Sequence, residues 1–168
     1  MEIERKWLVS EADIPYDLSA LDSLELEQVY VSFSPTIRVR RMRDRQGADS
    51  YVLTVKSAAV DAGALAREEY ETPIDGKAYK ALCAKGEGRP IRKTRYFVHR
   101  ADGLTEEIDL FHGELEGLAY LEIEFETLSD AETFPSPAWT TRDVSADKRY
   151  RNSALARYGM PETHGTEG

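Results

Sequence analysis

The sequence predicts a mainly β (α+β) fold, with eight antiparallel strands and a few helices. Short segments alternate polar and apolar residues with a period of two, and most of them are joined by links of hairpin length. In nearly every segment the charged residues keep one parity, and the branched and aromatic residues keep the other. Because successive side chains of a strand point to opposite faces, one face of the sheet is charged and the other is apolar.

Length and composition indicate one cytoplasmic domain. The 168 residues suit a single core, which we expect over residues 1–159, followed by a tail at 160–168. No apolar run has the length of a membrane span, and the acidic start does not resemble a signal peptide. The 22 Lys and Arg against 31 Asp and Glu give a net charge of −9, which argues against nucleic-acid binding through the outer surface. This charge does not exclude an anionic ligand in a cavity that gathers the basic groups.

The first strand, residues 1–8, sets the pattern. Glu2, Glu4 and Lys6 share one face, whereas Ile3 and Trp7 stand on the other. A pair of acids two positions apart suits a divalent cation, because Mg²⁺ takes oxygen ligands and shares its coordination shell with substrate phosphates. A solvated strand face is the alternative for this stretch alone.

Seven further segments continue the alternation. The first of them changes the parity of its apolar residues near Glu27 and Gln28, which predicts a bulge or a late strand start there. Pro73 is expected to end the strand that precedes it. Loops or turns are expected at 10–22, 44–47, 58–64 and 101–103. The seven segments are residues 24–33, 36–42, 51–57, 66–72, 91–100, 104–111 and 119–127.

Three helices are predicted between and after the strands. Residues 75–85 have helix-forming composition and are followed by glycine stop signals, and Cys83 in this helix is expected to be a structural thiol. A small helix is expected to begin at Ser129. Ser145 is expected to cap a last helix at 146–158.

The charged face of the sheet is compatible with two architectures. In an open sheet it would face water, whereas in a closed eight-stranded antiparallel β-barrel it would face inward, where there is room for one small ligand. Buried charges need partners, and a polyphosphate with a divalent metal would satisfy both signs, because Arg and Lys bind phosphate and carboxylates bind the metal. Arg67 is in phase with this face, either as an anion ligand or as a partner of neighbouring acids. The other residues of the face are Lys6, Arg38, Arg40, Lys56, Lys93, Arg95, Glu2, Glu4, Glu69, Glu71, Asp109, Glu122 and Glu124.

An ordered set of motifs runs from residue 2 to about residue 156. The opening E-I-E-R-K is followed by R-V-R at 38–40, L-T-V-K-S at 53–57, R-E-E-Y-E at 67–71, K-T-R-Y at 93–96, E-I-D-L-F at 107–111, L-E-I-E-F at 121–125 and D-K-R-Y-R-N at 147–152. This set resembles the CYTH superfamily, also called triphosphate tunnel metalloenzymes, whose signature is E-x-E-x-K. The family includes inorganic tripolyphosphatases, thiamine triphosphatases and a class of bacterial adenylate cyclases.

The resemblance implies a closed barrel that binds a triphosphate together with Mg²⁺ or Mn²⁺. By position, it implies phosphate ligands at Arg38, Arg40, Lys56, Lys93 and Arg95, with Lys148 at one mouth of the tunnel. It implies metal ligands at Glu2, Glu4, Glu122 and Glu124, with Asp109, Glu69 and Glu71 as further acids. Lys6, partnered by Tyr30, is either a general base whose pKa is lowered by neighbouring cations, or one more phosphate ligand.

The activity that we expect is metal-dependent hydrolysis of inorganic tripolyphosphate to diphosphate and phosphate. An adenylate cyclase or a nucleoside or thiamine triphosphatase would need a platform for the organic group, and no aromatic or apolar cluster is evident at a tunnel mouth. A noncatalytic polyphosphate-binding module is a third alternative, against which the two E-x-E pairs and Lys6 argue. We expect a monomer or a homodimer without nucleic-acid or membrane partners.

Overall fold

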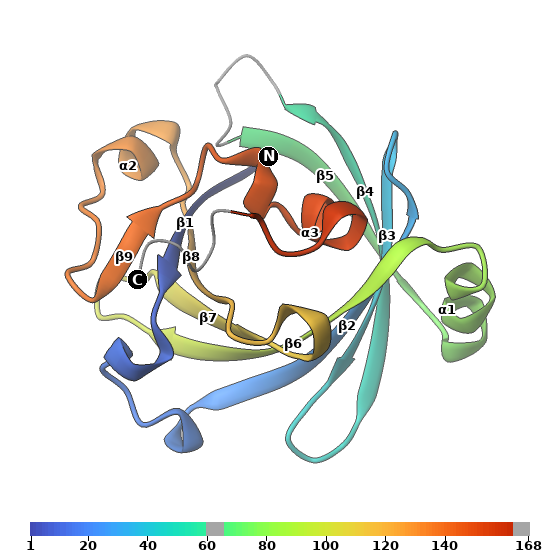
Figure 1. Cartoon of the computed structure of the whole chain (residues 1–168), viewed down its shortest axis with the longest axis horizontal. Coiled ribbons are helices and arrows are strands. Elements are labelled where there is room, and N and C mark those ends of the chain that lie inside the picture. Colours follow the sequence, from blue (N-terminus) through green and yellow to red (C-terminus); the bar gives the residue numbers. More distant parts are fainter. Residues whose placement is uncertain (60–65, 163–168) are drawn as a thin grey trace.

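The computed structural model describes residues 1–59 and 66–162, and its main feature is a closed β-barrel. Nine antiparallel strands follow the order β5-β4-β3-β2-β6-β7-β8-β1-β9, and β5 pairs in addition with β1. The β5–β1 pairing, which joins Glu2 to Arg67 and Ile3 to Ala66, closes eight of these strands into a barrel (Figure 1). The closed eight-stranded barrel is thereby confirmed, and the open sheet is excluded.

The strands and helices fall close to the predicted segments. The strands are β1 (Glu2–Val9), β2 (Asp22–Ser32), β3 (Thr36–Arg43), β4 (Asp49–Ala59), β5 (Ala66–Ile74), β6 (Glu87–His99), β7 (Thr105–Phe111), β8 (Ala119–Glu124) and β9 (Thr140–Asp143). The helices are α1 (Gly76–Cys83), α2 (Leu128–Thr133) and α3 (Asn152–Tyr158). Because β4 extends to Ala59, the loop predicted at 58–64 lies mostly outside the described residues, as does the tail from 163 onward. No helix in the described ranges is long and apolar enough to cross a membrane.

Two expectations about the strands need correction, and a third is confirmed. A ninth strand, β9, was not predicted, and it pairs with the end of β1 from Trp7 to Val9. The irregularity predicted near Glu27 and Gln28 is present, because the pairing of β2 with β6 shifts register between Gln28 and Tyr30. β5 also continues through Pro73, which pairs with β4.

The helices predicted at 75–85 and from Ser129 are both present as α1 and α2, but the residue that caps α2 differs from the one predicted. Asp75 caps α1 by accepting a hydrogen bond of 2.7 Å from the backbone N–H of Ala78. Tyr79 of α1 packs against Val29 on the outside of the barrel. Helix α2 is capped by Thr127 rather than Ser129, because the Thr127 hydroxyl accepts the N–H of Asp130.

The predicted last helix at 146–158 is wrong in its first half. The chain forms a 3-10 turn at Lys148–Tyr150, and α3 begins only at Asn152. Ser145 does not cap a helix, because its hydroxyl donates to Asp143 at 2.6 Å and accepts the backbone N–H of Lys6 at 2.9 Å. These contacts tie the segment after β9 to β1.

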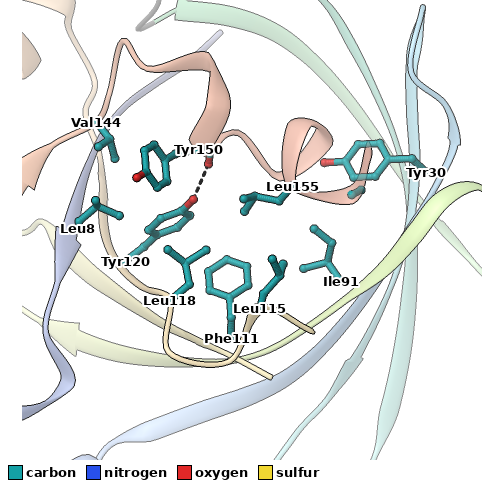
Figure 2. Packing of buried hydrophobic residues seen from close by; sticks show 11 residues of the cluster. Leu8, Tyr30, Ile91, Phe111, Leu115, Leu118, Tyr120, Val144, Tyr150 and Leu155 are labelled. Carbon is teal, nitrogen blue, oxygen red and sulfur yellow. Dashed lines mark hydrogen bonds between the residues drawn. The ribbon is translucent and has the colours of Figure 1, made fainter. Parts of the chain in front are cut away.

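Two large apolar clusters pack the helices against the barrel, one on its outside and one at one of its ends. The outer cluster packs residues such as Trp7 and Ile108 beneath α2 and β9. The inner cluster lies at one end of the barrel, where α3 covers the opening (Figures 1 and 2). Tyr120 there donates a hydrogen bond of 2.7 Å to the carbonyl of Tyr150. Met160 packs against the same cluster, so the packed chain continues past α3.

Candidate active site

The interior of the barrel holds two adjoining chambers. The wide chamber, of about 390 Å³, is lined by Met1, Glu2, Glu4, Arg38, Arg40, Lys56, Glu69, Glu71, Arg95, Glu107, Glu122, Glu124 and Asn152. The narrow chamber, of about 60 Å³, is lined by Glu2, Glu4, Lys6, Tyr30, Thr36, Arg38, Lys56, Arg67, Val144, Ser145, Asp147, Arg151, Asn152 and Ser153. The two chambers adjoin, and together we call them the tunnel; they share the lining residues Glu2, Glu4, Arg38, Lys56 and Asn152.

Most of the residues singled out from the sequence line this tunnel. They reach it because the charged parity of each strand points inward, as the register of β1 with β8 shows for Glu4↔Glu124 and Lys6↔Glu122. The predicted residues that line either chamber are Glu2, Glu4, Lys6, Tyr30, Arg38, Arg40, Lys56, Glu69, Glu71, Arg95, Glu122 and Glu124. Lys93, Asp109 and Lys148 do not line it.

Lys93 and Asp109 lie behind the tunnel wall. Their side chains are both fully buried, and Lys93 Nζ is 2.6 Å from Asp109 Oδ2. Asp109 also accepts hydrogen bonds of 2.7 and 2.9 Å from Nε and Nη2 of Arg95. Burial would raise the pKa of Asp109, but the charges of Arg95 and Lys93 outweigh it and hold this pKa well below its usual range. The geometry makes Asp109 the anchor of Arg95.

Lys148 is exposed in its 3-10 turn, away from both chambers. The same segment contributes other residues to the narrow chamber, namely Asp147, Arg151, Asn152 and Ser153. Arg151 was not among the expected site residues, because a helix at 146–158 would give this segment the wrong phase.

Arg38 and Arg40 provide positive charge that the protein itself leaves unpaired. Both project from β3, and Arg38 is 5% exposed. The Nε atoms of both are buried without a hydrogen-bond partner, and neither guanidinium forms an ion pair with the described residues. Burial, followed by the charges of Arg38 and Arg95, lowers the pKa of Arg40 to about 10. Buried donors of this kind fit an anionic ligand.

The acids of the wide chamber give it an excess of negative charge. Burial, followed by the charge of Glu122, raises the pKa of Glu4 to about 7. Glu4 makes no hydrogen bond or ion pair with the described part of the chain. The pKa of Glu124 is raised by burial and by Glu2 and Glu71, and that of Glu107 is raised by burial despite Arg95. Crowded carboxylates of this kind fit a divalent cation, although residues 1–59 and 66–162 contain no preformed cluster of three or more metal ligands.

Ion pairs connect the two sets of charges. Lys56 Nζ lies 3.4 Å from both Glu2 Oε1 and Glu69 Oε2. Arg95 approaches Glu107 at 3.1 Å and Glu122 at 3.5 Å. Glu107 was not among the expected site residues, although its parity on β7 matches that of Asp109 and would have placed it inside.

Lys6 occupies an acidic rather than a cationic environment. Its Nζ lies 3.3 Å from Glu122 Oε1, donates to the carbonyl of Tyr150 at 3.2 Å, and stands 4.7 Å above the centre of the Tyr120 ring. Burial disfavours its charge, but Glu122 and Glu4 outweigh burial and raise its pKa. The expected lowering of the Lys6 pKa is therefore wrong. Tyr30 faces the same chamber and stacks on Phe33, with ring centres 5.4 Å apart.

An aromatic cleft lies beside the wide chamber, and this also differs from the expectation. The cleft shares Glu107 and Glu124 with the wide chamber. Its lining includes Phe97, Phe125 and Phe134. The sequence did not reveal this cluster because its members come from β6 and from residues on either side of α2.

The fold and the site together define a class of protein: a closed β-barrel whose interior is lined by both basic and acidic side chains. The chain belongs to the CYTH family, since the CYTH domain model matches residues 1–151. It is 39% identical over 155 residues to an inorganic triphosphatase of Nitrosomonas europaea, an alignment that covers 92% of this chain and 96% of the relative.

Two further comparisons agree with this assignment. An inorganic triphosphatase of Acetivibrio thermocellus is 35% identical over 158 residues, which is 93% of each chain. A crystal structure of an inorganic triphosphatase superposes with a TM-score of 0.64 and 35% identity, covering 93% of this chain and 94% of that one. The family resemblance of the motifs is thereby confirmed.

Proposed function

We propose that this protein is a metal-dependent inorganic triphosphatase that hydrolyses tripolyphosphate to diphosphate and phosphate. The observation that carries the proposal is that one cavity holds two arginines, Arg38 and Arg40, which form no ion pair within the described residues, together with crowded carboxylates around Glu4. A linear polyphosphate with its metal neutralises both. Relatives that cover nearly the whole chain carry the name inorganic triphosphatase.

The acids of the wide chamber would hold Mg²⁺ or Mn²⁺. Their oxygen donors suit these hard cations, and the raised pKa of Glu4 indicates a carboxylate whose negative charge has too little compensation in the free protein. When bound, the metal supplies charge neutralisation at the phosphate oxygens. Phosphate oxygens would complete its coordination shell, since the protein has no preformed three-ligand cluster among the described residues. The ligands that we assign are Glu2, Glu4, Glu122 and Glu124, with Glu69 and Glu71 nearby.

The phosphates would be held by the cations of the tunnel wall. The Nε groups of Arg38 and Arg40 have no hydrogen-bond partner among the described residues, Lys56 lies between Glu2 and Glu69, and Arg95 is fixed by Asp109. We assign Asp109 to the positioning of Arg95 and not to the metal, because both of its oxygens are already engaged. Lys93 neutralises Asp109 from behind and does not meet the substrate.

Lys6 would act as a charged donor. Its raised pKa keeps the ammonium group protonated, and two of its contacts, to Glu122 and to the Tyr150 carbonyl, fix its direction. Phosphoryl transfer depends mainly on positioning and on stabilisation of charge, and a fixed ammonium beside the reacting phosphoryl group provides both. Tyr30 lines the same chamber and would help to orient the substrate.

The test is turnover of tripolyphosphate, ATP and thiamine triphosphate in parallel, with and without Mg²⁺ or Mn²⁺, and with phosphate, diphosphate and cyclic AMP resolved as products. We expect metal-dependent phosphate release from tripolyphosphate that is lost in Glu4→Gln. Binding of tripolyphosphate without turnover under all conditions would refute hydrolysis and identify a binding module.

A triphosphatase that acts on an organic substrate is the second candidate, because the aromatic cleft adjoins the wide chamber through Glu107 and Glu124. An organic group outside the tunnel would stack there. Faster turnover of ATP or thiamine triphosphate than of tripolyphosphate, reduced selectively by Phe97→Ala, would favour this candidate. Cyclic AMP with diphosphate as products would instead identify a cyclase.

A further inference from the structure

The two chambers of the tunnel differ in the sign of their charge. In the wide chamber the acids outnumber the cations, which are Arg38, Arg40, Lys56 and Arg95. In the narrow chamber the cations are Lys6, Arg38, Lys56, Arg67 and Arg151, against the acids Glu2, Glu4 and Asp147. The tunnel is therefore polarised along its length, and a linear anion with a metal at one end has a preferred direction in it.

Two arginines add to the positive charge of the narrow chamber. Arg67 belongs to β5, and Arg151 is the residue immediately before α3. Both line this chamber. Neither forms an ion pair with a carboxylate of the described residues. The acids of this chamber that form ion pairs are engaged by other cations: Glu2 lies 3.4 Å from Lys56 Nζ, and Asp147 Oδ2 lies 2.7 Å from Arg149 Nη2. Arg67 donates from Nε and Nη2 to the carbonyl of Ser57 at 3.2 and 3.0 Å, which fixes the guanidinium but does not neutralise it.

In the free protein the two guanidinium groups repel each other, which is unfavourable for the folded state. Burial, followed by the charge of Arg67, lowers the pKa of Arg151. Like charges that lie close together without a counter-ion disfavour the folded state, and an anion bound between them removes that repulsion.

We infer that Arg67 and Arg151 form a subsite for one terminal phosphoryl group of the substrate, at the narrow end of the tunnel. The volume of about 60 Å³, against about 390 Å³ for the wide chamber, suits a single phosphoryl group rather than the whole chain. The remainder of the substrate, with its metal, then extends toward the acids of the wide chamber. This inference rests on the proposed function only in taking a linear polyphosphate as the ligand.

The test measures the affinity for tripolyphosphate by isothermal titration calorimetry. EDTA is present, so that divalent metal is absent and no turnover occurs. The variants are Arg151→Gln and Arg67→Gln, and the matched control is Lys148→Gln, an exposed cation of the same segment as Arg151. Each arginine variant should weaken binding by about tenfold or more, as expected for the loss of a charge-assisted hydrogen bond. The control should bind like the wild type. Equal affinities of Arg151→Gln and Lys148→Gln would overturn the subsite.

Thermal unfolding of the free variants separates recognition from misfolding. Because Arg151→Gln removes a repulsion, its melting temperature without ligand should equal or exceed that of the wild type while its affinity falls. A melting temperature lowered in parallel with affinity would assign Arg151 a structural role instead. Failure of the wild-type protein to hydrolyse tripolyphosphate in metal would refute the proposed function and leave this binding test intact.

Recognition of a chain end has its own measurement. Trimetaphosphate is a ring of three phosphates and has no terminal phosphoryl group. The wild-type protein should bind linear tripolyphosphate more tightly than the ring, and Arg151→Gln should reduce this preference. Equal affinity of the wild-type protein for both anions, or an unchanged preference in the variant, would contradict recognition of the terminal group.

Discussion

Lys93 and Asp109 form an ion pair, Nζ to Oδ2 at 2.6 Å, in which neither side chain has any exposed surface. The same carboxylate receives two hydrogen bonds from Arg95, which faces the wide chamber. The buried carboxylate of Asp109 thus fixes the direction in which the guanidinium of Arg95 points into the chamber.

Asp109→Asn should destabilise the protein strongly. The amide leaves Lys93 buried without a counter-charge, and breaking a buried pair in this way costs about 3–5 kcal/mol. Urea denaturation followed by circular dichroism measures the loss. The double variant with Lys93→Met, which removes the stranded charge, should recover part of the stability; a double variant as unstable as the single one would show that the two residues are not coupled.

Lys93 should also make stability depend on pH in the alkaline range. Burial lowers its pKa from 10.5 to about 8, in spite of the attraction of Asp109. Between these two values the unfolded chain binds more protons than the folded one, so the contribution of Lys93 to stability rises with pH. The difference in unfolding free energy between wild type and Lys93→Met should shift in favour of the wild type from pH 8 to 10. A difference independent of pH would contradict the lowered pKa.

Arg40→Gln should weaken tripolyphosphate binding without destabilising the free protein. The substitution removes a charge-assisted contact to phosphate, worth about 1.5–3 kcal/mol, and also relieves the proximity of Arg40 to Arg38 and Arg95. Arg41→Gln is the matched control, since Arg41 is the next residue of β3 and points to the other face. Calorimetry and thermal unfolding measure the two effects. Similar losses of affinity in both variants would show that net charge, rather than the position of Arg40, determines binding.

Lys6→Ala should reduce kcat far more than it changes KM. Loss of a single fixed donor to a developing charge slows such reactions by about 10²- to 10³-fold. Lys6→Arg, which keeps the charge, should retain more activity than Lys6→Ala at all pH values. An arginine variant as inactive as the alanine variant, with a pH–rate profile that loses its acidic limb, would instead identify Lys6 as the general base.

The sequence is sufficient to predict the barrel and most of its inner wall. Strand parity is a strict geometric rule, so the alternation of Glu2, Glu4 and Lys6, or of Arg38 and Arg40, is enough to place these side chains on one face. Closure is harder to predict, because it depends on two residue pairs between β1 and β5 that have no signal of their own.

The predictions from sequence that are wrong depend on contacts between residues far apart in the sequence or on hydrogen bonds within turns. Ser145 and Asp147 are good helix-capping residues, but both form hydrogen bonds within turns, so the predicted helix loses its first half. The short strand β9 has no apolar alternation, because it only extends the outer edge of β1. The pKa of Lys6 depends on its distance to Glu122, and a count of cations in the same cavity cannot supply that distance.

Closure by β1 also constrains the order in which the chain can fold. β1 is the first strand in sequence, yet its main partners, β8 and β9, lie in the last third of the chain. During synthesis the hairpins from β2 to β5 can pair as soon as they emerge, whereas the longer pairing of β1 with β8 must wait for the last third of the chain, and such long-range pairing is slow. The wall that brings Glu4 and Lys6 opposite Glu124 and Glu122 can therefore be completed only after β8 has been synthesised.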